Sequence, residues 1–231
     1  MNLHLIEMLT NNSFHMSERK YLNDPFDSGF KITLDDYLKL YKERYPSLLT
    51  TKEQYESATF LFNANMENGE IDWARGIEHD KSIKKITCFT ENYANPLMWA
   101  HYAQNHTGVC LNFCTAKDEN FKNSLQPVNY LEELIEIKCI TDFEKSLLTK
   151  LHPWSIEKEW RIISSKEKFH FKRDALVEII FGLKVKDDTI SWFKGVLEGV
   201  FYMHTSIKKL RIKHSKIYIL NEYDEIMQPL K

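Results

Sequence analysis

The chain has 231 residues, of which 43% are hydrophobic and 28% are charged, with seven glycines and six prolines. This composition excludes a disordered or fibrous protein and is typical of a single compact domain over residues 1–231. The formal net charge of -2 creates no overall field that would attract nucleic acid or anionic lipid. Any phosphate contact would therefore require a local basic patch.

The N-terminal segment and the cysteines indicate a cytoplasmic chain. The segment MNLHLIEMLTNNSFHM has no basic stretch before a long apolar one, and no later run reaches about 18 apolar residues, so we expect neither export nor a membrane span. The cysteines, which form no C-x-x-C pair, are Cys88, Cys110, Cys114 and Cys139. Because Cys110 and Cys114 lack a second pair of ligands, we expect reduced thiols and no structural metal.

The first half of the chain has mostly helical patterns. In chain order, we predict a helix over residues 3–9, a strand over 12–17, a turn over 22–29, helices beginning at Thr33 and near Thr50, a strand over 83–89 and a helix over 96–104. Thr33 with Asp36, and Thr50 with Glu53, have the spacing of a capping box. Asn95 before Pro96 is a favoured helix start.

The second half is richer in strands. We predict strands over residues 108–114, 133–140, 157–164, 175–185, 208–215 and 216–221, and helices over 142–151 and around 190–197. The strand patterns combine alternating and continuous apolar runs. The whole order of elements is typical of an α+β fold with a mixed, mostly antiparallel sheet.

The block WSIEKEWRII, residues 154–163, carries the strongest candidate site. On a strand, Glu157, Glu159 and Arg161 would project from one face, because side chains alternate along a strand. The simpler interpretation is an exposed face with a Glu-Arg pair, which stabilises little. The functional interpretation is a polar pocket in which a carboxylate stabilises a cationic centre.

Two further blocks contain candidate ligand contacts. In NPLMWAHYAQNHTGVC, residues 95–110, Trp99 is expected to be core, whereas His101 and Tyr102 have polar ends that need water or a partner. In NDPFD, residues 23–27, the side chains of Asn23, Asp24 and Asp27 surround a proline turn. This loop either forms a simple Asx turn or lines a ligand pocket.

The run KKLRIKHSK, residues 208–216, is a candidate basic patch. On a strand, Lys209, Arg211 and Lys213 share one face. One interpretation is a solvated edge strand whose charges oppose aggregation. The other is a nucleic-acid contact, whose affinity would fall with salt.

Three of these blocks resemble an uncharacterised bacterial family filed as a domain of unknown function. They are NDPFD, NPLMWAHYAQNHTGVC, and WSIEKEWRII with the IIFG that follows it in the chain. Members of this family show an NDPFD loop, a PLMWAHY block before a strand, and a W-x-x-E-x-E-W-R block before another strand. The resemblance runs from about residue 3 to about residue 200. Members carry an additional strand rich in Tyr and Arg before the helix that begins here at Leu3, so we expect site residues of that strand to be missing.

The element order is also similar to that of DarT-type and other ADP-ribosyltransferases, in which a late glutamate holds the nicotinamide ribose of NAD. This resemblance implies an ADP-ribosyltransferase-like fold, NAD as cofactor, a nucleic-acid or protein target, and a role in bacterial stress or phage defence. It implies that Glu159 supports glycosidic cleavage, that Glu157 assists the nucleophile or orients the substrate, and that Arg161 positions the acidic pair or contacts a phosphate. We expect one cleft, also reached by the NDPFD loop and by His101 or Tyr102.

Two other classes of function remain open at this point. Glu136 and Lys138 resemble the E-x-K half of a restriction-type nuclease core, with Asp24 or Asp27 as a further ligand and Mg²⁺ as the metal. The second open class is a non-enzymatic interaction or sensor module. It is supported by the lack of a Gly-rich phosphate loop and of a Ser-His-Asp order in the sequence.

Overall fold

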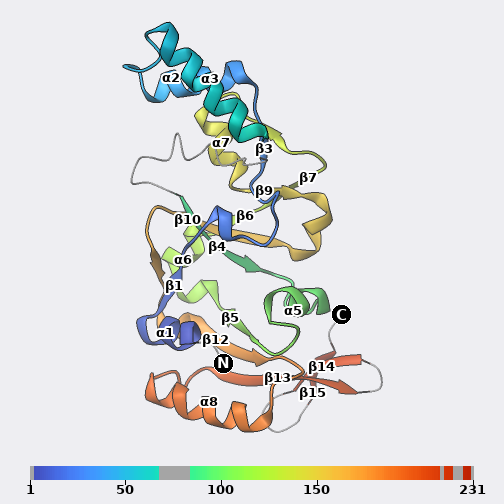
Figure 1. Cartoon of the computed structure of the whole chain (residues 1–231). Helices are drawn as coiled ribbons and strands as arrows, with labels where there is room; N and C mark the ends of the chain where they lie inside the picture. Colours follow the sequence, from blue (N-terminus) through green and yellow to red (C-terminus); the bar gives the residue numbers. More distant parts are fainter. Residues whose placement is uncertain (1–2, 68–83, 214–215, 221–225, 230–231) are drawn as a thin grey trace. The chain divides into compact units, whose positions relative to one another are not determined.

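The computed structural model describes residues 3–67, 84–213, 216–220 and 226–229. Its helices and mostly antiparallel sheets confirm the α+β class (Figure 1). The chain forms two compact units: unit 1 contains Met1–His15, Phe89–Leu125 and Lys168–Lys231, and unit 2 contains Met16–Cys88 and Gln126–Glu167. Each unit is thus assembled from separate stretches of chain. The single domain over residues 1–231 stays a prediction.

Unit 1 contains a five-stranded sheet with the order β15-β14-β13-β12-β5. Its strands are β5 (Val109–Phe113), β12 (Leu176–Phe181), β13 (Ser206–Lys213), β14 (Lys216–Leu220) and β15 (Ile226–Pro229). All neighbours are antiparallel except β12 and β13, which are parallel. The helix α8 (Asp187–Gly199) joins these two strands, as a parallel connection requires. Ile190, Phe193 and Leu197 form its buried side, as the sequence predicted.

Unit 1 also contains an aromatic cluster around Phe14. The remaining elements of this unit are α1 (Leu3–Asn11), β1 (Ser13–His15), α5 (Pro96–Tyr102), η2 (Thr115–Lys117), α6 (Glu119–Ser124), β11 (Lys168–His170) and η4 (Arg173–Ala175). The strand β1 pairs with β11 in antiparallel register, which positions Phe14. The Phe14 ring centroid lies 5.0 Å from that of Phe89, 5.1 Å from that of Phe113 and 4.6 Å from that of Phe171. These contacts hold distant segments of unit 1 together.

The turn after α5 explains why the IIFG block ends in a glycine, Gly182. A Cβ added at Gly182 would lie 2.3 Å from the carbonyl oxygen of His106, so this close approach requires glycine. Three successive residues of that turn have positive φ, at 46° for Gln104, 55° for Asn105 and 68° for His106. Because non-glycine residues adopt this conformation rarely, hydrogen bonds such as that from His106 N to Trp99 O must hold the turn.

Unit 2 has a four-stranded sheet with the order β2-β4-β10-β6, and two short parallel pairs, β3-β8 and β7-β9. Its strands are β2 (Ser17–Glu18), β3 (Phe30–Lys31), β4 (Lys85–Thr90, whose last two residues belong to unit 1), β6 (Gln126–Pro127), β7 (Asn129–Leu131), β8 (Ile135–Glu136), β9 (Thr149–Leu151) and β10 (Glu159–Ser164). Its helices are η1 (Arg19–Tyr21), α2 (Leu34–Arg44), α3 (Lys52–Glu67), α7 (Ile140–Ser146) and η3 (His152–Glu157). The β7-β9 pair and η3 bring the candidate site residues to β10.

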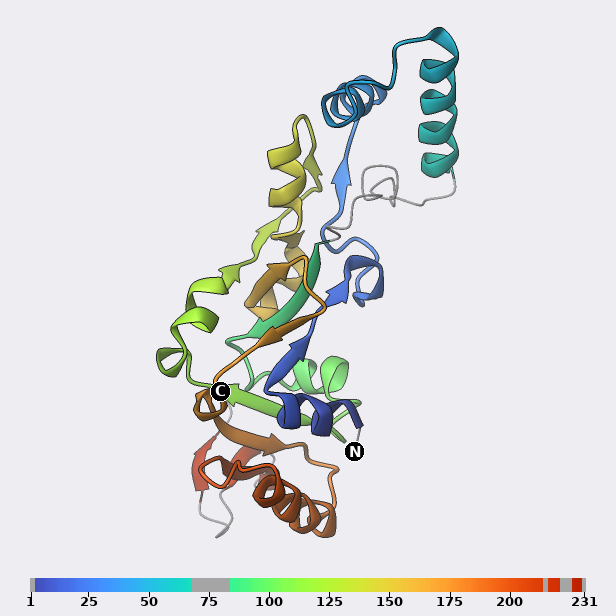
Figure 2. The same ribbon diagram turned by 90° about the vertical axis from the view of Figure 1, so that its left-hand side faces the viewer.

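The helices α2 and α3 pack over a separate hydrophobic cluster that includes Tyr37, Leu40 and Phe62. Figure 2 views α2 nearly end-on and α3 along its length, so their axes point in different directions. Thr33 caps α2 as predicted, since its side chain accepts a hydrogen bond from Asp36 N. The cap of α3 was predicted one residue too early: Gln54, not Glu53, accepts from the backbone N–H groups of residues 50 and 51.

Several predicted elements of the second half were wrong in extent. The expected strand over 133–140 is reduced to β8, and the expected helix over 142–151 is α7 followed by β9. The expected strand from Glu157 begins only at Glu159, because η3 precedes it and Lys158 takes a left-handed conformation with φ of 44°. Residues 83, 214, 215 and 221 of three predicted strands lie outside the described residues.

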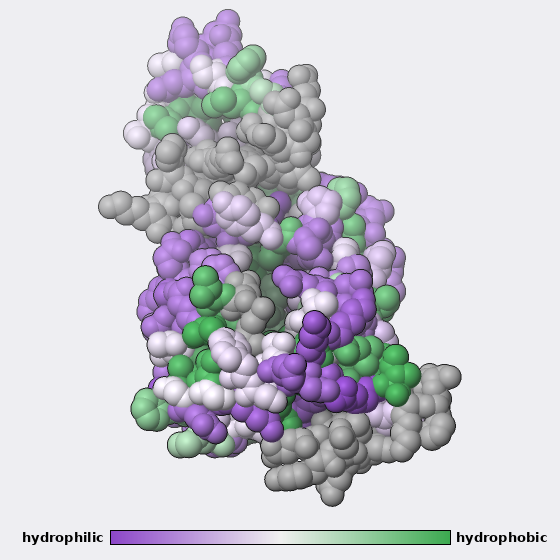
Figure 3. Space-filling model, turned by 60° about the horizontal axis from the view of Figure 1, so that its bottom comes forward, coloured by the Kyte–Doolittle hydropathy of each residue, from purple (hydrophilic) through white to green (hydrophobic). Residues whose placement is uncertain are grey.

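Among the described residues, no helix has the length and apolar character needed to cross a membrane. On the face shown in Figure 3, hydrophobic residues form separate small groups among hydrophilic ones. Scattered exposed hydrophobic residues of this kind are normal in proteins.

Candidate functional site

The NDPFD loop folds into a turn that buries two carboxylates. Asp24 Oδ1 accepts a hydrogen bond from Phe26 N at 2.9 Å, as in an Asx turn, and Asp27 N donates to Asp24 O at 3.0 Å. Asp24 and Asp27 are only 5% and 3% exposed, whereas Asn23 is exposed. The loop is therefore an Asx turn that directs acidic side chains into the protein, and its role in lining a ligand pocket stays a prediction.

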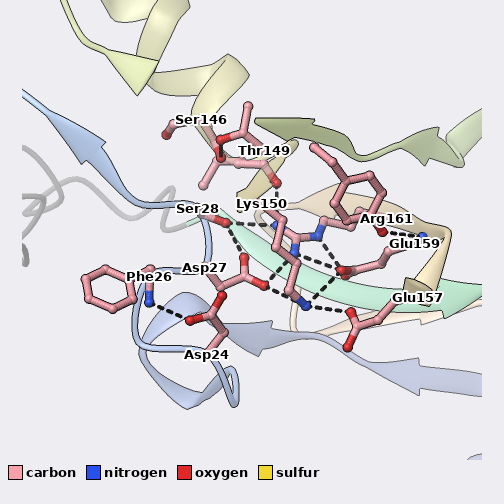
Figure 4. Close-up of polar contacts among 12 residues, drawn as sticks. Asp24, Phe26, Asp27, Ser28, Ser146, Thr149, Lys150, Glu157, Glu159 and Arg161 are labelled. Atoms are coloured by element: carbon pink, nitrogen blue, oxygen red, sulfur yellow. Dashed lines mark hydrogen bonds and ion pairs between the residues drawn. The ribbon is translucent and has the colours of Figure 1, made fainter. Parts of the chain in front are cut away.

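The Arg161 guanidinium joins this loop to β10 (Figure 4). It is fully buried and donates all five of its N–H groups. Nη2 lies 2.6 Å from Asp27 Oδ2, Nη1 lies 2.9 Å from Ser28 Oγ and 2.8 Å from Leu147 O, and Nε lies 2.8 Å from Glu159 Oε1. A second Nη2 contact reaches Glu159 Oε2 at 3.1 Å, so that pair is bidentate.

A lysine that the sequence analysis did not select completes the group. Lys150 Nζ lies 2.6 Å from Glu157 Oε2, 3.2 Å from Glu159 Oε2 and 3.4 Å from Asp27 Oδ2. It also lies over the Trp154 ring, 4.7 Å from the centroid. We call Asp27, Lys150, Glu157, Glu159 and Arg161 the charged cluster. Each of its side chains is at most 5% exposed.

Glu159 is held ionised at the centre of the charged cluster. Burial alone would raise the pKa of Glu159, but the hydrogen bond and charge of Arg161, with the charge of Lys150, outweigh burial and lower that pKa. Burial likewise opposes the charge of Arg161, yet its bond to Glu159 and the charge of Asp27 raise the pKa of the guanidinium. The backbone N–H of Glu159 donates to Tyr130 Oη at 2.8 Å. The carboxylate therefore has a fixed charge and a fixed orientation.

Cys88 of β4 is a solvent-exposed residue that contacts Glu159. The residue is exposed, and its thiol hydrogen-bonds to the Glu159 carboxylate. Many protein atoms nevertheless surround the sulfur, so desolvation, followed by the charge of Glu159, raises the pKa of the thiol. Cys88 is therefore a neutral donor to Glu159 rather than a reactive thiolate.

The residues of the 95–110 block lie in unit 1. Trp99 is buried as predicted, and its Nε1 donates to Tyr93 O at 2.7 Å. His101 and Tyr102 are exposed on α5, with ring centroids 6.3 Å apart. The charged cluster is formed by unit 2 residues alone, and the role of His101 and Tyr102 stays a prediction.

The basic run differs from the expected edge strand. It forms β13, which is the central strand of the five-stranded sheet, so the interpretation as a guarded sheet edge was wrong. Lys209 is buried, and its Nζ lies 2.5 Å from Val185 O and 2.7 Å from Asp187 Oδ1. Arg211 Nη2 reaches the same oxygen at 2.9 Å. Lys213 lies in β13 opposite Lys216. Asp187 therefore offsets part of the patch's positive charge.

The residues of the E-x-K pattern form a surface ion pair. Glu136 Oε2 lies 3.0 Å from Lys138 Nζ, and both side chains are more than half exposed. Within the described ranges, no group of three or more His, Cys, Asp or Glu residues is arranged to hold a metal ion.

The comparisons with known proteins give a family likeness without an activity. Residues 98–162 match a family model described as "Protein of unknown function (DUF2971)". The match begins on α5 and ends one residue after Arg161, so it covers most of two of the three blocks from which the family resemblance was inferred. No curated protein and no solved structure matches the chain.

Lys150, Ser28 and Cys88 were missed by the sequence analysis. Lys150 was assigned to a predicted helix, although Pro153 shortly after it disfavours helix. The run Leu148–Leu151 has no apolar alternation that would have identified β9. The excess of acidic residues among the candidates was a second signal, because buried carboxylates require cationic partners.

Proposed function

We propose that the charged cluster is a catalytic site that cleaves the bond between nicotinamide and ribose in NAD and transfers ADP-ribose to a nucleic-acid or protein target. The observation that carries this proposal is the ionised, buried Glu159 carboxylate, fixed between Arg161 and Lys150 beside the exposed Cys88. The family likeness gives no activity of its own, so the proposal depends on this geometry and on the resemblance to ADP-ribosyltransferases.

The proposed reaction needs a fixed negative charge. The bond between ribose C1′ and the pyridinium nitrogen breaks, nicotinamide leaves as a neutral molecule with the bonding electrons, and C1′ develops an oxocarbenium charge. A nucleophile of the target then adds to C1′ and loses its proton. Glu159 would stabilise the developing cation, and Glu157 would accept the proton.

The other members of the charged cluster would act as positioning residues. Arg161 holds Glu159 and Asp27 in one arrangement, and Lys150 lies between Glu157 and Glu159. A preorganised group of this kind needs no rearrangement when charge appears on the substrate. We further propose that the NDPFD loop contacts NAD, whereas the ligand contacts expected of His101, Tyr102, Arg211 and Lys213, which lie in unit 1, stay predictions.

The test is release of nicotinamide from NAD by the purified chain, with cellular nucleic acid or protein as acceptor. Glu159→Gln keeps the shape of the side chain but removes its charge, so turnover should fall by roughly 10²-fold or more. The matched control is Glu133→Gln, at an exposed carboxylate paired with Lys31, which should retain wild-type turnover. Undiminished turnover in Glu159→Gln would contradict the proposal, as would a wild-type chain that consumes no NAD. Mg²⁺-dependent cleavage of nucleic acid would favour the nuclease alternative instead.

A further inference from the structure

A groove runs along the exposed side of α3 in unit 2. Two hollows of about 240 Å³ and about 480 Å³ adjoin there, since Glu53, Ser57 and Leu61 line both of them. In Figure 2, α2 lies on one side of α3 and no described element lies on the opposite side. We call the two hollows together the α3 groove.

The α3 groove leaves apolar side chains in contact with water. Phe60 is 71% exposed and Leu61 is 52% exposed, and Leu48, which lines the first hollow, is 36% exposed. Another side of the same helix buries Ala58 and Phe62 in the hydrophobic cluster that includes α2. The core of unit 2 therefore does not use Phe60 and Leu61. Neighbouring exposed apolar residues that line one groove are typical of an interaction site.

The spacing of the lining residues indicates the shape of the partner. On α3 the second hollow is lined by residues 53, 56, 57, 60 and 61, which follow the series i, i+3, i+4, i+7 and i+8. Side chains at this spacing share one face of a helix. A helix presents such a face to another helix, and an amphipathic helix lies in a groove through the same spacing. The α3 groove therefore fits a helix.

The charges of the α3 groove indicate the chemistry of that helix. Glu53 and Glu56 are the charged residues of its lining, and both are acidic. Glu56 Oε1 lies 3.7 Å from Lys52 Nζ, but both side chains are more than half exposed, so this pair contributes little. The Glu53 carboxylate is bonded to its own backbone and to Thr51, and none of the described residues supplies a cation to it. A cationic partner would complement both carboxylates.

We propose that the α3 groove binds a basic amphipathic helix of a protein partner. The apolar side chains of this helix would cover Phe60 and Leu61, and its lysine or arginine side chains would pair with Glu53 and Glu56. The inference does not depend on the proposed function, because none of these residues belongs to the charged cluster.

Two peptides isolate the charge of the partner. The first is a fluorescent helical peptide of leucine and lysine in amphipathic order, and the second carries glutamate in place of each lysine and keeps the same apolar face. Fluorescence anisotropy with the purified wild-type chain should give roughly tenfold or more tighter binding of the lysine peptide. Equal affinity, tighter binding of the glutamate peptide, or no binding of either peptide would overturn the inference.

Charge reversal tests the two carboxylates. The double variant Glu53→Lys with Glu56→Lys should reverse the preference, so that the glutamate peptide binds more tightly. The matched control is Glu119→Lys with Glu144→Lys, which changes the net charge equally at exposed positions of α6 and α7. This control should keep the wild-type preference. The same reversal in both double variants would show that net charge alone attracts the peptide, and would overturn the inference.

The variant Phe60→Ser tests the apolar part of the α3 groove. Binding of the lysine peptide should weaken roughly tenfold or more, as expected for an aromatic residue at the centre of an interface. The control is Tyr21→Ser in η1, where the side chain is also 71% exposed, and it should bind as the wild type does. Circular dichroism checks that each variant is folded.

Two results with Phe60→Ser would contradict the inference. One is unchanged binding of the lysine peptide by the folded variant. The other is a wild-type chain that sediments as a dimer and a Phe60→Ser chain that sediments as a monomer. That result would show that a second copy of the chain, rather than a basic helix, occupies the α3 groove.

Discussion

Arg161 illustrates how much one buried side chain can stabilise a fold. Replacement by Met would leave Asp27 and Glu159 buried without their partner, so Arg161→Met should lower the free energy of unfolding by about 3 to 5 kcal/mol. Urea denaturation measures this change. The comparison is Lys31→Met, which breaks the 2.6 Å pair with Glu133, where the side chains are 58% and 78% exposed. That substitution should change stability by about 1 kcal/mol or less. Similar losses in the two variants would show that the cluster is not a stabilising unit.

The pKa of Glu159 predicts a dependence of stability on pH. In the folded protein the pKa of Glu159 lies below its ordinary value of 4.5, so its ionised form stabilises the fold. This contribution is fully present above about pH 4.5 and is lost as the pH falls through the lowered pKa. Glu159→Gln should therefore lose less stability than the wild type on acidification below that pH. The measurement is urea denaturation across this range, with Glu144→Gln at an exposed site of α7 as control. Parallel curves for wild type and Glu159→Gln would contradict the assignment.

At the residue scale, the sequence indicated the members of the cluster better than their geometry. Strand alternation predicted that Glu157, Glu159 and Arg161 share a face, and they do meet. Glu157, however, belongs to η3, and it reaches the cluster through Lys150 rather than through the pleat of β10. The residue types were enough to predict that these side chains interact, because buried carboxylates need cationic partners. The left-handed conformation of Lys158, which turns the chain between η3 and β10, had no signal in the sequence.

The helix α5 allows packing and surface roles to be separated within one element. Trp99 is 3% exposed and packs with Ile180, Leu210 and Ile219, so Trp99→Ala should destabilise the protein by about 3 to 5 kcal/mol. Tyr102 is 49% exposed, so Tyr102→Phe should leave the melting temperature close to that of the wild type. Thermal unfolding of the two variants tests the contrast. A large loss on Tyr102→Phe would identify its hydroxyl as a structural group.

At the element scale, prediction succeeded where the signal was local. The caps at Thr33 and Asn95 and the buried side of α8 depend on residues within a few positions of one another, and all three were predicted. Pairing between distant strands is not encoded locally. The run containing Lys209 and Arg211 therefore looked like an edge, although the parallel partner β12 and the antiparallel partner β14 enclose it. Its cations were satisfied by Asp187, whose position at the start of α8 became clear only from the fold.

At the scale of the whole molecule, the segment that matches the family model is continuous in the chain and includes parts of both units. The matched residues 98–162 include part of unit 1, up to Leu125, and part of unit 2, from Gln126 onward. The α+β class could be predicted because it depends on the kinds of element present. The division into units could not, because it depends on which distant segments pack together. Composition and periodicity carry no information on that choice.

The interleaving of the two units has a consequence for synthesis at the ribosome. Asp27 and its partner Arg161 are 134 residues apart in the chain. At translation rates of roughly 5 to 20 residues per second, the arginine emerges on the order of ten seconds after the aspartate. During that interval the NDPFD loop has no guanidinium to bind, and β10 has not yet joined β4. Unit 2 can close only late in translation, and such long-range pairings fold slowly. The acidic loop is then exposed to water and to chaperones for longer than any other part of the charged cluster.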